Sequence, residues 1–146
     1  MIEDMTLPIA DDRNAAEVAY WNGPGGERWV SHQRLQDALL AEVAGLLLER
    51  AAPRAGETVL DIGCGAGTTS MALARQVAPA GRVLGVDVSA PLLERARQQV
   101  SAGLPVEFAL ADATVYPFAP RAADLLFSRF GVMFFADPAR SGSSVR

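Results

Sequence analysis

The chain has 146 residues, 50% of them hydrophobic and 21% charged, which is enough for one domain with a buried core. Its net charge of -4 and its scattered basic residues argue against nucleic acid as a partner, because phosphate binding depends on concentrated positive charge. One cysteine and one histidine exclude an internal disulfide and argue against a metal site, and they suit the reducing conditions of the cytoplasm.

The N-terminal third is predicted to be helical. Residues 1–12 are polar and interrupted by proline, so they predict a loose arm without the order of a secretory signal. Residues 14–21 predict a short helix that ends at the glycine- and proline-rich segment 22–26. Residues 27–51 predict one long helix, because apolar side chains recur there at helical spacing. No apolar stretch approaches the roughly 20 residues of a membrane span.

From residue 58 onward, short apolar runs alternate with helical segments. The predicted strands are residues 58–62, 82–88, 106–110 and 124–128, and the predicted helices are residues 68–77 and 92–100. Thr68 or Thr69 is expected to cap the first of these helices, and Ser89 the second, with Pro91 in its first turn. Strands separated by helices predict an α/β fold with a Rossmann-like parallel sheet of about four strands.

Three features follow the predicted strands and point to a ligand site at one edge of the sheet. Residues 63–67 form a loop with three alternating glycines after the first strand, Asp87 closes the second, and Asp112 follows the third. Ligands bind beyond the carboxyl ends of parallel strands, and an acid about 20 residues after such a loop is placed to hold ribose hydroxyls. The sequence therefore predicts a nucleoside-like ligand.

The identity of that ligand follows from loop spacing and charge. Dinucleotide sites usually show G-x-G-x-x-G, whereas this loop reads G-x-G-x-G and is preceded by Asp61. A carboxylate disfavours a pyrophosphate but favours a ligand with ammonium and sulfonium groups, such as S-adenosyl-L-methionine. A nicotinamide-dependent oxidoreductase that uses the same loop and Asp87 stays open as the alternative.

The same segments resemble the successive motifs of class I S-adenosylmethionine-dependent methyltransferases, in particular the small-molecule branch of ubiquinone and menaquinone biosynthesis. The matching segments are residues 59–68, 85–89, 109–113 and 123–135, with residues 20–22 and 26–29 similar to the N-terminal helices of that branch. The resemblance implies a methyltransferase that uses S-adenosyl-L-methionine and a small-molecule methyl acceptor.

For the methionine half of the cofactor, the resemblance implies contacts from the first and fourth strands. Gly63 and Gly65 would lie against the methionine and ribose parts, with Asp61 near the ammonium group, directly or through water. Ser128 would contribute backbone contacts near the methionine, and Arg129 would face the substrate.

For the adenosine half, the resemblance implies contacts from the second and third strands. Asp87 would accept hydrogen bonds from the ribose hydroxyls, and Val88 would pack on the adenine. Asp112 would accept a hydrogen bond from the adenine amino group, and the Ala113 amide would donate one to a ring nitrogen.

The resemblance also implies a division of the chain. Residues 1–54 would form an N-terminal arm and helices on the lid and substrate side, residues 55–140 the cofactor-binding core, and residues 141–146 an irregular tail. The family sheet has seven strands, so we expect a chain truncated after its fourth core strand. The fourth strand would then be an unpaired edge through which the chain self-associates, and a catalytically inactive cofactor-binding fragment is a further alternative.

No catalytic residue is predicted, because methyl transfer from an activated sulfonium requires mainly alignment and the exclusion of water. His32 is a candidate general base, against the simpler interpretation of an exposed helical histidine. Tyr20, Trp21 and Trp29 are candidates for an aromatic lid, against a role in anchoring the N-terminal helices. Cys64 is interpreted as a small loop residue rather than a nucleophile.

Overall fold

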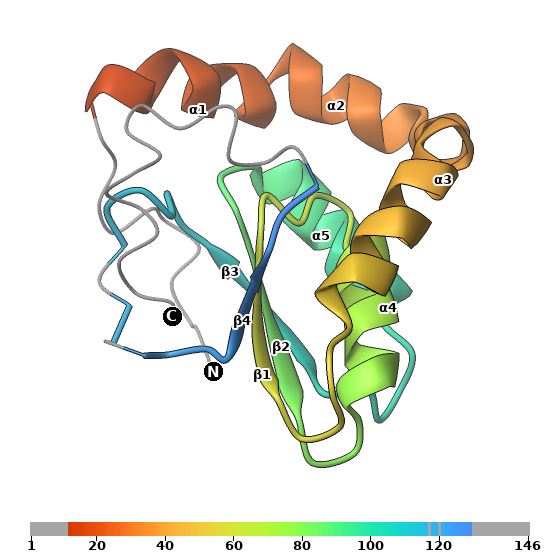
Figure 1. Cartoon of the computed structure of the whole chain (residues 1–146). Helices are drawn as coiled ribbons and strands as arrows, with labels where there is room; N and C mark the ends of the chain where they lie inside the picture. The colour runs from red at the N-terminus through yellow and green to blue at the C-terminus, as the bar shows by residue number, and fades with distance from the viewer. Residues whose placement is uncertain (1–11, 117, 120, 130–146) are drawn as a thin grey trace.

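The computed structural model describes residues 12–116, 118–119 and 121–129 (Figure 1). Its first elements are a single 3-10 turn η1 (Asp12–Asn14) and the helices α1 (Ala15–Asn22), α2 (Pro24–Ser31) and α3 (Gln33–Ala51). The remaining elements are β1 (Thr58–Ile62), α4 (Thr68–Val77), β2 (Arg82–Asp87), α5 (Ala90–Gln99), β3 (Val106–Leu110) and β4 (Leu125–Phe127). The arm predicted at residues 1–12 and the tail predicted at 141–146 lie outside the described residues, except for Asp12.

The prediction of one long helix over residues 27–51 was wrong. Two helices occupy this region, and they meet at His32, where the backbone leaves the helical conformation (φ -111°, ψ 19°). The glycine- and proline-rich segment ends α1 at Asn22, as predicted, and it also begins α2. Pro24 stands in the first turn of α2, where its missing N–H breaks no hydrogen bond. Gly26 allows close packing there, since a Cβ atom would lie 2.0 Å from the Trp21 carbonyl oxygen and 2.8 Å from Ser89 Oγ.

The four strands form one parallel sheet in the order β3-β2-β1-β4, which confirms the predicted Rossmann-like α/β fold. The first and third strands have the predicted bounds, the second ends one residue earlier, and the fourth is shorter at both ends. After β3 the chain crosses back to pair β4 with β1, so the strand order reverses beside β1. Ligands bind at such a switch point in open α/β sheets.

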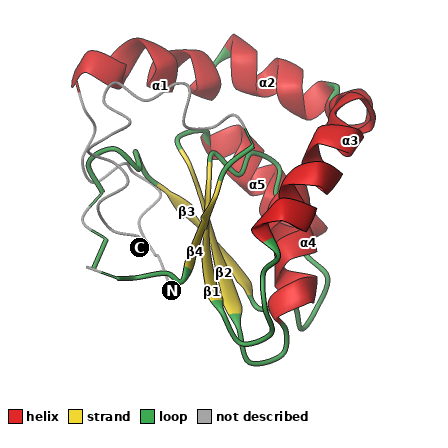
Figure 2. Cartoon of the chain, in the orientation of Figure 1, coloured by secondary structure: helices red, strands yellow, loops and turns green. Residues whose placement is uncertain are grey.

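Both faces of the sheet are apolar, as expected of parallel strands. Figure 2 shows α3 and α4 beside one of these faces. On the face covered by α3 and α4, Val59 and Val83 pack against Leu73, Ala74 and Val77. Neighbouring residues of β1 and β2, together with residues of β3 and of the segment between β3 and β4, form a second cluster on the opposite face. Its buried members are Leu60, Ile62, Val86, Ala109, Ala111, Ala113 and Ala123. This alternation decides which side chains at the strand ends reach the helices.

The two helices that follow β1 and β2 begin differently. Ser89 caps α5 as predicted, because its Oγ accepts a hydrogen bond from the Leu92 amide at 3.4 Å, and Pro91 lies in the first turn. The predicted cap of α4 by Thr68 or Thr69 was wrong. Its N-cap is Gly67, with φ +87°, and both threonine hydroxyls donate hydrogen bonds to aspartates instead.

Helices α1 and α2 lie across the end of the sheet at which the strands finish (Figure 1). Asn22 Nδ2 donates to the Val88 carbonyl oxygen at 2.6 Å, and Asn22 Oδ1 accepts from the Ala90 amide at 3.0 Å. Ser89 Oγ donates to the Trp21 carbonyl oxygen at 2.6 Å. These bonds connect residues more than 60 positions apart and fix the helices over the strand ends. No helix within the described ranges is long and apolar enough to cross a membrane.

Candidate cofactor site

A cavity of about 470 Å³ lies where the carboxyl ends of the first three strands meet the N-terminal helices. Its volume is in the range of pockets that hold small-molecule ligands. Six of the eight predicted cofactor-binding residues line it: Gly63, Gly65, Asp87, Val88, Asp112 and Ala113. The other two, Asp61 and Ser128, do not.

The loop between β1 and α4 is held by the neighbouring strand. The amides of Gly63 and Cys64 donate to the Val86 carbonyl oxygen at 2.8 and 3.1 Å, and the Gly65 amide donates to Asp87 Oδ2 at 2.8 Å. Gly65 has φ +57° and Gly67 has φ +87°, in the left-handed region that favours glycine. A Cβ atom on Gly65 would meet no atom within 4 Å, so the backbone borders open space there.

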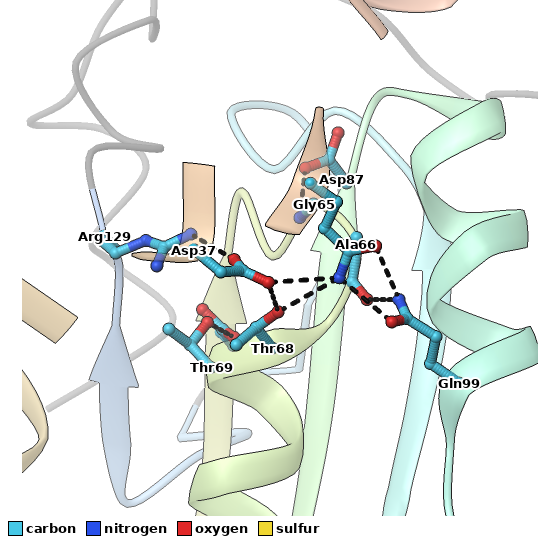
Figure 3. A network of polar contacts seen from close by, with 10 residues as sticks. Asp37, Gly65, Ala66, Thr68, Thr69, Asp87, Gln99 and Arg129 are labelled. Carbon is cyan, nitrogen blue, oxygen red and sulfur yellow. Dashed lines mark hydrogen bonds and ion pairs between the residues drawn. The ribbon is translucent and has the colours of Figure 1, made fainter. Parts of the chain in front are cut away.

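Asp87 ends β2 with its carboxylate turned back over this loop (Figure 3). Besides the Gly65 bond, Asp87 Oδ1 accepts from the Ser89 amide at 2.9 Å. Burial raises the pKa of Asp87 above its ordinary value, and the backbone N–H donors oppose that shift. Because each carboxylate oxygen has two acceptor positions, Asp87 keeps capacity for ligand hydroxyls.

Asp112 follows β3 and is almost fully buried, with 1% of its surface exposed. Its Oδ1 accepts from the amide and the hydroxyl of Thr114 at 3.0 and 2.6 Å, and its Oδ2 accepts from Asn14 Nδ2 at 3.3 Å. Asn14 is itself buried and lines the cavity, so the N-terminal helices complete this end of the site. The sequence gives little signal for Asn14, because the contact spans 98 residues.

Asp61 is fully buried and does not line the cavity, and its expected place near the ammonium group, directly or through water, stays a prediction. It shares a face of β1 with Val59, beneath α4, because side chains alternate along a strand. The hydroxyls of Thr69 and Ser70 donate to its Oδ2 at 2.8 and 2.6 Å, and its Oδ1 has no hydrogen-bond partner among the described residues. Burial raises the pKa of Asp61 from 3.8 to about 6.

Replacing Asp61 with Asn is expected to change how the stability of the ligand-free protein depends on pH. Between the unfolded pKa of 3.8 and the folded pKa of about 6, the folded state binds more protons, so the free energy of unfolding falls as pH rises. The Asp61→Asn variant lacks this titration, and its stability relative to wild type should rise by about 1 kcal/mol from pH 5 to pH 7.5. Urea unfolding of both proteins at the two pH values measures this, and a pH-independent difference would contradict it.

The residues after β4 divide between structure and cavity. Ser128 Oγ donates to the Ile62 carbonyl oxygen at 2.9 Å, which connects the ends of β4 and β1 away from the cavity lining. Arg129 does line the cavity, and its Nη2 lies 3.9 Å from Asp37 Oδ1 of α3.

The aromatic candidates separate in the same way. Trp21 and Trp29 line the cavity and contact each other edge to face, with ring centroids 5.9 Å apart. Tyr20 is 45% exposed and lies outside the lining, as does the exposed His32, whose Nδ1 is 2.9 Å from the Arg28 carbonyl oxygen. Burial raises the pKa of the Cys64 thiol well above its ordinary value, so Cys64 is a protonated thiol rather than a nucleophile at neutral pH.

A polar network that the sequence interpretation missed connects α3 to the glycine loop (Figure 3). Asp37 Oδ2 accepts from Thr68 Oγ1 at 2.9 Å and from Gln33 Nε2 at 3.3 Å. Gln33 and Gln99 exchange hydrogen bonds at 3.1 Å in both directions, and Gln99 Nε2 donates to the Ala66 carbonyl oxygen at 3.2 Å. The available signal was the spacing of Gln33 and Asp37, which places two polar side chains on one helix face.

In the part of the chain that the structure describes, no group of His, Cys, Asp and Glu side chains is arranged to hold a metal ion.

Comparison with known proteins identifies the family to which this site belongs. A family model described as a methyltransferase domain matches residues 59–143, which is more than half of the chain. The chain belongs to the class I S-adenosylmethionine-dependent methyltransferases. This confirms the resemblance found in the sequence, and the nicotinamide-dependent oxidoreductase is not favoured.

Named relatives show which branch is nearby. The chain is 36% identical over 94 residues to the 2-phytyl-1,4-naphtoquinone methyltransferase of Trichormus variabilis, which covers 62% of this chain and 41% of the relative. It is 38% identical over 89 residues to the demethylmenaquinone methyltransferase of Clavibacter sepedonicus, covering 61% of this chain and 35% of the relative. The chain therefore spans less than half the length of either quinone methyltransferase.

A solved structure supports the fold independently of close sequence similarity. Magnesium protoporphyrin IX methyltransferase from Synechocystis, determined with bound S-adenosylmethionine, matches with a TM-score of 0.67 at 20% identity. The match covers 90% of this chain and 69% of that protein.

Proposed function

We propose that the chain binds S-adenosyl-L-methionine in the cavity at the strand ends and transfers its methyl group to a small-molecule acceptor. The main support is that a glycine loop and two aspartates, contributed by three adjacent strands, line one cavity under the N-terminal helices. Membership of the methyltransferase family favours this ligand over other nucleosides.

The adenosine half of the ligand would be held by the ends of β2 and β3. Asp87 would accept from the ribose hydroxyls, with Val88 against the adenine. Asp112 would accept from the adenine amino group, sharing its Oδ2 with Asn14, and the Ala113 amide would donate to a ring nitrogen. The donor set fits this half, since it offers two acceptors at the ends of neighbouring strands.

The methionine half would lie along the glycine loop. Gly63 and Gly65 would contact it, and the open space beside Gly65 is consistent with a closely bound ligand. Asp61 would act only from beneath the loop, and Ser128 would contribute by connecting β4 to β1.

The cofactor supplies a methyl group already activated by its sulfonium, so the chain has to align the acceptor and exclude water. Trp21 and Trp29 of the N-terminal helices, together with Leu40, provide apolar surface over the strand ends for both tasks. No described residue is assigned as a catalytic acid or base. The names of the two quinone methyltransferases support a flat, apolar acceptor such as a reduced naphthoquinone.

Thermal unfolding of the full chain, with and without S-adenosyl-L-methionine, tests cofactor binding, with NADH as the control. A ligand at about 100 times its dissociation constant stabilises the folded state by roughly 2.7 kcal/mol. We expect S-adenosyl-L-methionine to raise the melting temperature and NADH to leave it unchanged. No shift with S-adenosyl-L-methionine would contradict the proposal.

Methyl transfer is tested by incubating the chain with methyl-labelled cofactor and a reduced naphthoquinone. We expect label in the quinone product. Cofactor binding without transfer to this or other flat aromatic acceptors would instead support the catalytically inactive fragment.

Three further expectations form part of the proposal. Residues 1–54 would act as lid and substrate side, residues 55–140 as cofactor core and residues 141–146 as tail. Self-association would involve β4, which pairs with β1 and has no second strand partner among the described residues; a monomer in sedimentation velocity would contradict it. A cytoplasmic location is supported by the lone, buried, reduced Cys64.

A further inference from the structure

The charged side chains that line the cavity are unequal in number. Among the described residues of the lining, the acids are Glu17, Asp37, Asp87 and Asp112, and the single cation is Arg129. S-adenosyl-L-methionine carries a sulfonium, an ammonium and one carboxylate. In this cavity its positive groups have several acidic side chains as partners, whereas its carboxylate has Arg129.

Arg129 lies at a defined end of the cavity. The sheet order β3-β2-β1-β4 places Asp112, Asp87, the glycine loop and Arg129 in that sequence along the rim, because each follows or ends one of these strands. If Asp112 and Asp87 hold adenine and ribose, as the proposed function requires, the remaining part of the ligand extends over the loop toward Arg129. That part is an α-amino acid with one carboxylate and one ammonium group.

Asp37 provides an opposite charge at the same end (Figure 3). The 3.9 Å between Asp37 Oδ1 and Arg129 Nη2 is longer than a direct hydrogen bond, so the two charges are near each other without a tight bond. Their side chains are 28% and 13% exposed, respectively, which leaves both within reach of a ligand in the cavity but weakly screened by water.

The position of Asp37 is fixed by neutral groups rather than by a second charge. Thr68 and Gln33 both donate to its Oδ2, and Gln33 continues through Gln99 to the Ala66 carbonyl oxygen of the glycine loop. Asp37 Oδ1 is consequently directed toward Arg129 while Oδ2 is held. Asp61 has no comparable access, because Thr69 and Ser70 enclose it beneath the loop.

We propose that Asp37 and Arg129 form the subsite for the amino-acid end of the ligand. The Arg129 guanidinium binds the α-carboxylate with its planar array of N–H donors, and the Asp37 carboxylate binds the α-ammonium. When the ligand binds, the 3.9 Å contact between Asp37 and Arg129 is replaced by one contact from each side chain to the ligand. This inference rests on the proposed function. It assigns to Asp37 the role that the resemblance implied for Asp61, and it gives Arg129 a contact with the cofactor where the resemblance implied one with the substrate.

Isothermal titration of the full chain with two nucleosides tests the subsite. S-adenosylhomocysteine carries the amino-acid end, whereas 5′-methylthioadenosine lacks it. We expect Arg129→Gln and Asp37→Asn each to weaken the binding of S-adenosylhomocysteine about tenfold. The binding of methylthioadenosine should weaken less than twofold. Arg129→Lys should recover part of the loss, and the matched controls Arg50→Gln and Glu42→Gln, on exposed positions of α3, should change neither affinity.

Wild-type protein alone provides a second measurement that does not depend on variant folding. It should bind S-adenosylhomocysteine at least about tenfold more tightly than decarboxylated S-adenosylhomocysteine, the analogue that lacks only the carboxylate. Equal wild-type affinities for these two, or equal weakening of both nucleosides by Arg129→Gln, would overturn the subsite and leave the proposed function intact. Binding of neither nucleoside by the wild type would overturn both.

Discussion

Replacing Asp87 with Asn is expected to weaken S-adenosylhomocysteine binding by about 100-fold while the chain stays folded. The carboxylate is proposed to accept two ribose hydroxyls, and a hydrogen bond to a charged group contributes roughly 1.5–3 kcal/mol. The same side chain also receives the Gly65 amide at 2.8 Å, so its replacement loosens the loop against which the ligand lies. Both effects lower affinity for the adenosine part itself.

Isothermal titration measures this loss of affinity. Asp87→Asn should weaken the binding of methylthioadenosine as well as that of S-adenosylhomocysteine, whereas the Arg129 and Asp37 variants should weaken mainly the second. Glu94→Gln, on the exposed surface of α5, is the matched control and should bind as wild type does. Circular dichroism of the ligand-free variants verifies folding. If the affinity of the Asp87→Asn protein lies within threefold of the wild-type affinity, Asp87 does not hold the ribose hydroxyls.

Replacing Gly67 with Ala is expected to lower the free energy of unfolding by about 2–5 kcal/mol. The residue has φ +87°, where an alanine pays roughly 1–2 kcal/mol, and overpacking of a core adds roughly 1–3 kcal/mol. The added Cβ would lie 2.9 Å from Phe108 Cζ and 3.0 Å from Ala96 Cβ, both of them buried. Neither neighbour is the free end of a flexible side chain.

Gly65→Ala provides the comparison, because its φ of +57° carries a similar backbone cost with no atom within 4 Å of the added methyl. Its loss in chemical denaturation should be about 1 kcal/mol. Equal losses for the two variants would show that the contact with Phe108 and Ala96 relaxes, and that only backbone conformation matters.

The sheet and its ligand edge could be predicted from local patterns. Buried parallel strands are short, apolar and β-branched, so residues 58–62 and 106–110 were bounded correctly without any knowledge of their partners. The glycine loop, Asp87 and Asp112 follow directly from those bounds, because the ends of parallel strands meet at one edge.

The N-terminal helices were predicted less well, and α3 shows the reason. Apolar side chains occur on two sides of this helix, and the structure leaves Leu35, Leu39 and Leu46 more than half exposed. Its inner side near the cavity carries the buried Gln33 and the partly buried Asp37. Helical periodicity alone gave no means of choosing between the two sides, and it also failed to place the break at His32.

The sequence by itself determined the strand-loop-helix order, the glycines and the acids that end the strands, since each depends on neighbours a few positions away. Tertiary structure decided which of those acids reach the cavity. Asp61 is enclosed because alternation along β1 turns it beneath α4, where Thr69 and Ser70 donate to it. Asn14 and Asp37 enter the site through helix packing. Asn14 contacts Asp112, which is 98 positions away, and Asp37 contacts Thr68, which is 31 positions away, so neither contact leaves a local sequence pattern.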